Sequence, residues 1–454
     1  MNIFHFPESF LESIKCCSGY EAEPFEKVHL EKFPISIRNN PFKKQNKNNL
    51  DEVVPWCENG FYLNKRPEFV FDPCFHGGAY YVQEASSMFL YHILKGLPNL
   101  EKNKICLDVC SAPGGKATII SDFLNNQGLL VANEVIKSRS LVLKENIIKW
   151  NSFNAIITNN DPSQFGKLKQ MFDLILVDAP CSGSGLFRKD PNATNEWTLE
   201  GVKHCALRQK RILADVLPSL KNNGHLIYST CSYSEEENEQ ILDWLTENFN
   251  LESKQIEIPA EWGIVESRSK KCGAFGYRFY PNNLKGEGFF ISLLLNKEAT
   301  DSEKKSKKIN KKNEFFRGEI SNWLSPNDLV IHKQVNGEIF ALPKKFNDEI
   351  SLFESELNVI NSGTRIGKMI HDELIPDHQL ALSHLVSDTV MKFELDLETS
   401  IKYLRKDSVR IETEFRGWAL VRYSGINLGW VKILNNRINN NYPKEWRILK
   451  DYKN

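Results

Sequence analysis

The sequence predicts an α/β protein whose central domain is built on a largely parallel β-sheet. Between Leu107 and Leu295, short apolar runs alternate with helical stretches, and each run has the length of a buried strand. The runs are "KICLDVC", "GLLVANE", "NAIITNND", "FDLILVDAP", "GHLIYSTC" and "EGFFISLLL". Alternation of this kind is typical of a sheet covered by helices on both faces. A chain of 454 residues also has room for about two to four domains.

The segment before the central domain predicts a small α+β domain over residues 1–85. It contains "FPISIRNNP" and "VVPWCENGFYL", which read as strands between turn residues. The stretch "YYVQEASSMFLYHIL" then leads into a helix expected at about 84–95, close to the start of the central domain at residue 86. We therefore expect the central domain to span residues 86–298.

The C-terminal third predicts a linker and two further units. Residues 299–314 are charged and almost free of apolar side chains, so they cannot repay the entropy of ordering and are expected to form a linker. A mixed domain is expected over 315–385. Residues 386–454 show short alternating strands and turn glycines at 417, 425 and 429, which predict a β-rich domain.

Bulk composition limits the function classes. The formal net charge is zero, which argues against indiscriminate coating of nucleic acid by charge alone. The ten cysteines are about 2% of the residues and lack the spacing of a zinc site, so we expect reduced thiols and no metal. No apolar run is long enough to span a bilayer, and the N-terminus lacks the pattern of a signal peptide. The expected location is the cytoplasm, with no membrane partner.

Local charge is different in the last fifty residues. From Ile401 to Asn454 there are twelve Lys or Arg residues against five Asp or Glu residues. Aromatic residues are interleaved with them: Tyr403, Trp418, Tyr423, Trp430, Tyr442 and Trp446. Cations suit RNA phosphates and exposed rings suit unstacked bases, so RNA is the expected partner of this domain. The alternative is a small domain with core aromatics and a solvated basic face.

A glycine loop follows the first strand of the central domain in "ICLDVCSAPGGKATIISDFL". It lacks the phosphate-binding Walker pattern, because Cys110 and Ala117 occupy the positions that need Gly and Ser or Thr. Glu134 and Asp161 follow the next two strands, where carboxylates in such folds reach ribose hydroxyls. The combination favours an adenosine ligand without a polyphosphate, of which S-adenosylmethionine is the commonest. For each acid taken alone, an exposed loop residue is the favoured interpretation. The occurrence of both acids in register after successive strands favours the ligand site.

Four motifs together resemble those of the RNA cytosine carbon-5 methyltransferases, the NOL1/NOP2/sun family: "LDVCSAPGGKAT", "VDAPCSGSG", "YSTCSYSEEENE" and "YRFYPNNLKGEGFF". They fall in family order over about residues 105–295, and "YYVQEASSM" extends the likeness upstream. The tail "GWALVRYSGINLGWVKILNNRINNNYPKEWRI" is similar to the PUA-like domain of bacterial RsmF-type 16S rRNA enzymes. The resemblance implies a Rossmann-like methyltransferase core, S-adenosylmethionine as cofactor and 16S rRNA as substrate, acting as a monomer.

The resemblance also assigns roles to individual residues. The cofactor residues that it implies are Cys110, Ser111, Ala112, Pro113, Gly114, Gly115, Lys116, Glu134, Arg139, Asp161 and Asp178. Lys116 would be an active-site cation, and Asp178 would also hydrogen-bond the cytosine edge. In the family, the Thr-Cys position is the nucleophile and the Pro-Cys position assists release, so Cys231 and Cys181 take these roles.

The chemistry explains why two thiols are needed. Carbon 5 of cytosine becomes nucleophilic when a thiolate adds to carbon 6, and a second group must then help to detach the product. Both cysteines follow strands, where ligands bind in open α/β folds. Ser234 and Glu237 form a capping-box sequence, which predicts a helix N-terminus near Cys231 that favours its thiolate.

Target selection is expected to depend on cations near the first thiol, because a base must be unpaired or flipped out to react. Arg188, Lys189 and Arg208 could contact phosphates, although surface solvation explains them equally well. Three other functions compete with rRNA methylation. They are a tRNA methyltransferase of the same family, an assembly factor that binds RNA without turnover, and a DNA methyltransferase, which would leave Cys231 unexplained.

Overall fold

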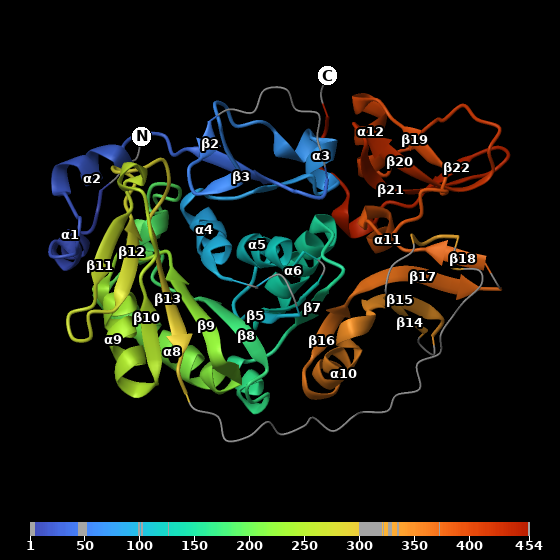
Figure 1. The fold of residues 1–454 in the computed structure, drawn as a ribbon. Coiled ribbons are helices and arrows are strands. Elements are labelled where there is room, and N and C mark those ends of the chain that lie inside the picture. The colour runs from blue at the N-terminus through green and yellow to red at the C-terminus, as the bar shows by residue number, and fades with distance from the viewer. Residues whose placement is uncertain are drawn as a thin grey trace.

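The computed structural model of the chain describes residues 5–43, 52–98, 100, 103–125, 127–298, 320, 322–325, 329–333, 336–371 and 373–452. The linker expected over 299–314 lies outside the described residues. Figure 1 shows a central sheet with a small N-terminal sheet above it, and two further small sheets built by the C-terminal part of the chain.

The N-terminal part has the expected α+β composition. Its elements are α1 (Glu8–Ile14), α2 (Ala22–His29), β1 (Ile35–Asn39), β2 (Val53–Val54), β3 (Cys57–Leu63), the 3-10 turn η1 (Phe69–Phe71), α3 (Pro73–His76) and β4 (Tyr80–Val82). The four strands form a sheet in the order β2-β3-β1-β4. The helix expected at about 84–95 is α4 (Phe89–Gly96), preceded by the 3-10 turn η2 (Ser86–Met88).

All six runs predicted as strands are strands of one central sheet. They are β5 (Ile105–Asp108), β6 (Leu129–Asn133), β7 (Ala155–Thr158), β8 (Phe172–Asp178), β9 (Leu220–Thr230) and β13 (Phe289–Asn296). The described sheet runs β11-β12-β13-β9-β8-β5-β6-β7-β16, and β10 (Leu251–Lys254) pairs with β13. Strands β5 to β9 are parallel, whereas β13 runs antiparallel to β9. The edge strands β11 (Val265–Arg268) and β12 (Phe275–Phe279) continue the antiparallel side.

Helices cover both faces of this sheet and close its two hydrophobic cores. One core contains side chains of α4, α5 (Gly115–Leu124) and α6 (Lys137–Trp150). The other contains side chains of α8 (Leu199–Val216), α9 (Glu239–Asn248) and α10 (Asn347–Glu356). Every residue of β5, β6 and β7 is buried, as expected of parallel strands covered on both faces. The remaining elements of this part are short: η3 (Pro162–Lys167), η4 (Ser184–Leu186), α7 (Ala193–Glu196), η5 (Leu217–Ser219), η6 (Glu235–Glu237) and η7 (Ala260–Trp262).

The segment after the linker contributes to two sheets. The strands β14 (Leu329–Lys333), β15 (Glu338–Pro343), β17 (Thr364–Ile370) and β18 (Glu373–Pro376) form a separate antiparallel sheet. Between them, β16 (Val359–Ser362) pairs antiparallel with β7 and so extends the central sheet. The helix α10 precedes β16 after the 3-10 turn η8 (Lys344–Phe346), and α11 (His378–Leu382) follows β18.

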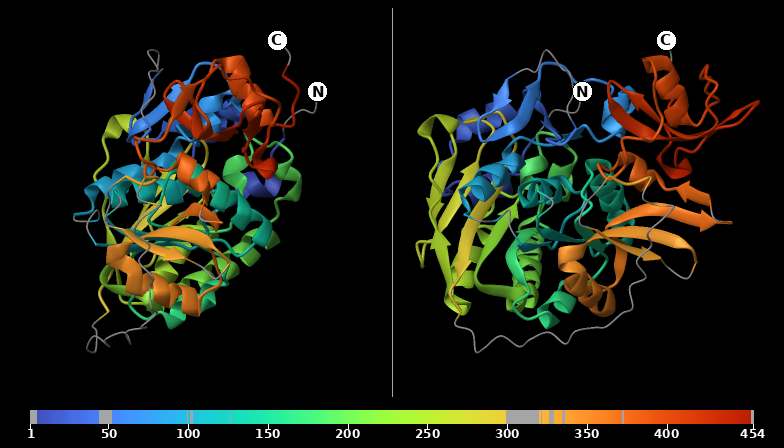
Figure 2. Two further views of the ribbon diagram at one scale, coloured as in Figure 1. Left: turned by 90° about the vertical axis from the view of Figure 1, so that its right-hand side faces the viewer. Right: turned by 45° about the vertical axis from the view of Figure 1, so that its right-hand side comes forward.

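The C-terminal domain is β-rich, as its sequence predicts. It contains β19 (Lys392–Glu394), α12 (Leu397–Arg405), β20 (Gly417–Tyr423), β21 (Ile426–Ile433), β22 (Ile438–Asn440) and η9 (Lys444–Trp446), with strand order β19-β20-β21-β22. Figure 2 shows this domain beside the N-terminal sheet. Ile426 packs in a hydrophobic cluster with Cys74 and Tyr80, so the C-terminal domain makes an apolar contact with the N-terminal part.

Candidate active site

The glycine loop lies where the strand order of the central sheet changes direction. The strand β5 has β6 on one side and β8 on the other, so the chain leaves β5 first toward one edge and later returns toward the other. Open α/β sheets bind ligands at this switch point, beyond the carboxyl ends of the strands. Gly114 has a φ of +118°, and a Cβ there would lie 3.3 Å from Leu143. Glycine therefore allows the tight turn into α5.

A pocket of about 170 Å³ opens beside this loop. It brings the loop together with the ends of two parallel strands and with the β4–η2 segment of the N-terminal part. Its lining residues are Tyr81, Val82, Gln83, Glu84, Ser87, Asp108, Cys110, Ser111, Ala112, Pro113, Gly115, Lys116 and Asp178. Most of the residues expected to bind the cofactor therefore share one pocket, whereas Gly114, Glu134, Arg139 and Asp161 do not line it.

Glu134 and Arg139 are nevertheless connected to the loop. The Arg139 guanidinium lies 3.6 Å from Glu134 Oε2 and donates a hydrogen bond of 2.8 Å to the carbonyl oxygen of Ala112. Glu134 is buried at the end of β6 and accepts the main-chain N–H of Ile136. Asp161 is more exposed, caps η3 through Ser163 and pairs with Arg211 at 3.2 Å.

Asp108 is a functional candidate that the sequence patterns did not single out. Its side chain is fully buried at the end of β5, and neither carboxylate oxygen has a hydrogen-bond partner among the described residues. Burial, with a smaller contribution from the Asp178 carboxylate, raises the pKa of Asp108 to about 7, and Ser111, Lys116 and the Cys110 main chain offset only part of this rise. An unpaired buried carboxylate is costly and marks a site for a cationic ligand group. The sequence feature that could have pointed to Asp108 is its position as the last residue of a strand before a glycine loop.

Lys116 and Asp178 form an ion pair at the mouth of the loop. Lys116 Nζ lies 2.8 Å from Asp178 Oδ2, and Asp178 Oδ1 accepts a hydrogen bond of 2.7 Å from Ser229 Oγ. Burial alone would lower the pKa of Lys116, but Asp178 and Cys231 outweigh it and the pKa is raised. Lys116 also lies 4.9 Å from the ring centre of Phe289. A cationic ammonium group is therefore held beside Asp178 at the glycine loop.

The two cysteines singled out by the sequence lie in contact. Cys181 Sγ is 3.0 Å from Cys231 Sγ, although the residues are fifty positions apart. They follow β8 and β9, which are parallel neighbours, so the two loops leave the sheet at the same edge. The pKa of Cys181 is raised well above its usual range by the hydrogen bond with Cys231 and by burial. Cys181 therefore keeps its proton in this arrangement, and a protonated thiol is a poor nucleophile.

The predicted capping box after Cys231 is wrong. Residues 235–237 form the short 3-10 turn η6, and α9 begins only at Glu239 with Asn238 before it. Ser234 Oγ is buried without a hydrogen-bond partner among the described residues. Glu237 points instead toward the loop of Cys181, where Ser182 supplies both a main-chain and a side-chain donor. Because the Glu237 carboxylate is buried, it needs hydrogen-bond donors, and it accepts those of the Cys181 loop instead of forming the local cap with Ser234.

The cation expected beside Cys181 for phosphate contact is also placed differently. The Arg188 side chain is 6% exposed, lies 3.8 Å from Glu287 and donates to the carbonyl oxygen of Lys32 at 2.7 Å. It therefore joins the central domain to the N-terminal part and does not face solvent. Lys189 and Arg208 are exposed, as an RNA contact would require.

The aromatic residues of the C-terminal domain divide into two groups. Tyr403 and Tyr442 are buried in its core, and Trp430 is buried in a cluster with Ile339 and Leu380 of the preceding segment. The interpretation that these three rings face RNA is therefore wrong. Trp418, Tyr423 and Trp446 are partly exposed. The same domain carries exposed cations that have no acidic partner within 4.0 Å among the described residues, and they include Arg410, Arg437 and Lys444. These side chains are free to meet phosphates.

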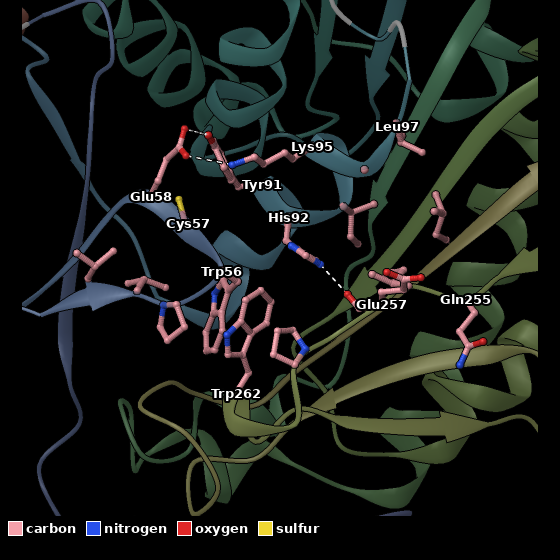
Figure 3. A pocket seen from close by; sticks show the side chains of 18 residues that line it. Trp56, Cys57, Glu58, Tyr91, His92, Lys95, Leu97, Gln255, Glu257 and Trp262 are labelled. Carbon is pink, nitrogen blue, oxygen red and sulfur yellow. Dashed lines mark hydrogen bonds and ion pairs between the residues drawn. The ribbon is translucent and has the colours of Figure 1, made fainter.

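A larger pocket of about 780 Å³ lies elsewhere, between β2–β3, α4 and residues 255–262. Figure 3 shows Trp56 and Trp262 on one side of it and Glu58 with Lys95 on another. Neither cysteine of the contacting pair lines it. In the part of the chain that the structure describes, no cluster of three or more His, Cys, Asp or Glu side chains is arranged to hold a metal. No described helix is both long and apolar enough to cross a membrane.

Together, the doubly wound sheet, the glycine loop and the pocket at its switch point define a Rossmann-like, S-adenosylmethionine-dependent methyltransferase. Comparison with known proteins gives the family. Residues 96–295 match the model described as 16S rRNA methyltransferase RsmB/F. Residues 6–85 match the N-terminal domain of 16S rRNA methyltransferase RsmF, and residues 390–448 match the methyltransferase RsmF PUA domain. The chain belongs to the RsmB/F family of 16S rRNA methyltransferases.

Full-length relatives support this assignment. The chain is 30% identical to ribosomal RNA small subunit methyltransferase F of Vibrio vulnificus, over 97% of each protein. It is 29% identical to the protein of the same name from Shewanella piezotolerans, over 98% of each. Among solved structures, a methyltransferase homologue from Pyrococcus horikoshii superposes with a TM-score of 0.54 at 29% identity, covering 64% of this chain and 96% of the other. The family and the fold class inferred from the sequence are thus confirmed.

Proposed function

We propose that the protein methylates carbon 5 of a cytosine in the 16S rRNA of the small ribosomal subunit, through a covalent bond between Cys231 and carbon 6 of the base. The observation that carries the proposal is the pair of thiols, 3.0 Å apart, beside a partly buried Lys116–Asp178 ion pair. Methyl transfer to oxygen or to an amine needs no thiol pair. Methylation at a ring carbon of cytosine needs one group to attach and one to assist detachment.

The pocket residues fit S-adenosylmethionine. Asp108 offers a buried carboxylate without a partner among the described residues, which suits a cationic group of the cofactor. The loop from Cys110 to Gly115 offers close backbone approach, and Glu134 stands at the strand end where carboxylates accept ribose hydroxyls. Arg139 links Glu134 to this loop, and Asp161 follows the next strand. The cofactor supplies an electrophilic methyl group.

Cys231 begins the reaction by adding its thiolate to carbon 6 of the cytosine. The new S–C6 bond pushes an electron pair into the ring. The Lys116–Asp178 pair stabilises the charge and supplies a proton to the ring nitrogen, and it takes this proton back when the Cys231 thiolate leaves. Carbon 5 is then a nucleophile and accepts the methyl group. The raised pKa of Cys181 supports Cys231 as the attacking thiol, because the neighbouring sulfur keeps its proton.

Cys181 then assists release. Its pKa is raised first by the hydrogen bond with Cys231. That hydrogen bond is lost once the Cys231 sulfur is bonded to carbon, which removes the largest cause of the raised pKa while burial remains. The Cys181 thiol then passes its proton to water, and the resulting thiolate accepts the carbon 5 proton. Loss of this proton reforms the ring double bond and expels the Cys231 thiolate. Each thiol therefore prepares the other for its own step.

Covalent trapping tests the assignment. With Cys181→Ala, attachment and transfer proceed but release stalls, so protein accumulates on 16S rRNA in a denaturing gel when S-adenosylmethionine is present. With Cys231→Ala, or with both changes, neither adduct nor methylation is expected, because attachment precedes release. An adduct formed by Cys231→Ala and not by Cys181→Ala would show that the roles are reversed. Small subunits, free 16S rRNA and tRNA serve as parallel substrates, and bisulfite sequencing identifies the modified base.

A further inference from the structure

One buried carboxylate contacts both thiol loops. Glu237 is fully buried, and its Oε1 accepts the main-chain N–H of Ser182 at 2.8 Å. Its Oε2 accepts the hydroxyls of Ser182 and Ser232, each at 2.5 Å. Ser182 directly follows Cys181, and Ser232 directly follows Cys231. A single side chain therefore bonds the residue next to each reacting sulfur.

A residue of α8, Gln209, also contacts the Glu237 carboxylate. Gln209 is fully buried, and its Nε2 donates to Glu237 Oε1 at 3.2 Å and to the carbonyl oxygen of Pro180 at 3.1 Å. Gln209 Oε1 accepts the hydroxyl of Tyr228 at 2.9 Å. The loop of Cys181 is thus fixed on both sides of the thiol. A buried polar network whose members all have partners is rigid and specifies one arrangement.

We propose that Glu237 is a positioning residue that sets the separation of Cys181 and Cys231. The inference rests on the two-thiol function proposed above and extends it to the group that holds the thiols in place. Glu237 does not line the pocket beside the glycine loop, so it acts on the sulfurs through Ser182 and Ser232. A misplacement of about 1 Å in a reacting group can lower a rate by about 100-fold.

Three single variants separate positioning from general stability. Glu237→Ala removes every carboxylate contact. Glu237→Gln keeps the shape and the main-chain contact, and serine hydroxyls can accept as well as donate, so it should rescue the geometry. Glu239→Gln is the matched control, because Glu239 is also buried near the same turn but bonds Arg278 and Ser267, each at 2.6 Å.

The sulfur separation can be measured without RNA. Phenylarsine oxide condenses with two neighbouring thiols, forming two As–S bonds and releasing one water, and it binds tightly only when both sulfurs are close. Its affinity is measured for the full-length protein and each variant, and the signal of the Cys181→Ala/Cys231→Ala double variant is subtracted to remove the other cysteines. The kcat, and the KM for S-adenosylmethionine, are measured on small subunits with the same preparations.

Positioning by Glu237 predicts a joint loss of arsenical binding and turnover. Glu237→Ala should lower the arsenical affinity at least tenfold and the kcat about 100-fold, with the KM for S-adenosylmethionine within twofold of wild type. Glu237→Gln should recover most of both losses, and Glu239→Gln should bind the arsenical as wild type does. If Glu237→Ala does not fold, the Ser182→Ala/Ser232→Ala protein removes the same hydroxyl contacts and takes its place.

Unchanged arsenical affinity in these folded variants would overturn the role of Glu237. A different outcome would contradict the proposed two-thiol reaction without contradicting the role of Glu237. If wild-type protein binds the arsenical tightly but forms neither methylated RNA nor an adduct with Cys181→Ala, the proposed function is wrong, and the arsenical series still decides what sets the thiol separation.

Discussion

Replacing Asp108 by asparagine is expected to stabilise the protein and to weaken cofactor binding. The side chain is buried without a hydrogen-bond partner among the described residues, and its pKa is raised from 3.8 to about 7, chiefly by burial. Above pH 7 the folded protein must therefore hold a buried charge that Ser111, Lys116 and the Cys110 main chain compensate only in part. Below about pH 4 the carboxyl group is protonated in both the folded and the unfolded chain, so no penalty exists there. Asparagine removes the charge at nearly constant shape.

The expected gain in the free energy of unfolding follows from the shift in the pKa of Asp108. Three pH units correspond to an upper limit of about 4 kcal/mol, at about 1.4 kcal/mol per unit. The gain in the free energy of unfolding should approach this limit at pH 8, stay below about 2 kcal/mol at pH 5 and vanish below pH 4. Chemical unfolding of the cofactor-free protein at several pH values measures it. A gain that is absent at pH 8, or that is the same at pH 5 and pH 8, would refute the reasoning.

A carboxylate on the neighbouring strand provides a control of opposite sign. Asp173 on β8 pairs with Lys221 at 2.8 Å and with Lys104 at 3.1 Å. Burial acts to raise the pKa of Asp173, but these partners outweigh it and the pKa is lowered. Asp173→Asn should therefore destabilise the protein above about pH 4, and the loss should fade as the pH falls through the folded pKa. Of these two variants, only Asp108→Asn should weaken the binding of S-adenosylmethionine, and calorimetry should show a loss of affinity of at least about tenfold.

Two further changes test the outer parts of the proposed site. Glu134→Ala should lower the affinity for S-adenosylmethionine at least about tenfold, since a buried acceptor is lost at the end of β6; unchanged binding in calorimetry would exclude a contact with the ribose. Replacing Arg410, Arg437 and Lys444 by glutamine should weaken RNA binding and flatten its salt dependence while leaving cofactor binding intact. Equal RNA affinity at every salt concentration would place the RNA elsewhere.

Local patterns in the sequence were sufficient to predict the fold class and to predict that the proposed site residues follow the ends of strands. The six apolar runs became strands because their length and composition fit a buried parallel sheet, whichever neighbours they pair with. Strand ends are equally local, so the sequence pattern alone places Asp178, Cys181 and Cys231 at one edge of the sheet. The family motifs then indicated the class of enzyme, an rRNA methyltransferase.

Other features depend on contacts between residues far apart in the chain, and only the tertiary structure decided them. The local pattern at Glu237 fits a helix cap, yet burial against the Cys181 loop gave this carboxylate better donors. Arg188 reads as a surface cation but is enclosed by the N-terminal part. The isolation of Asp108 and the 3.0 Å approach of the two sulfurs likewise arise from packing. Hydrogen-bond partners and solvent exposure are set by which surfaces meet, and residue spacing along the chain does not contain that information.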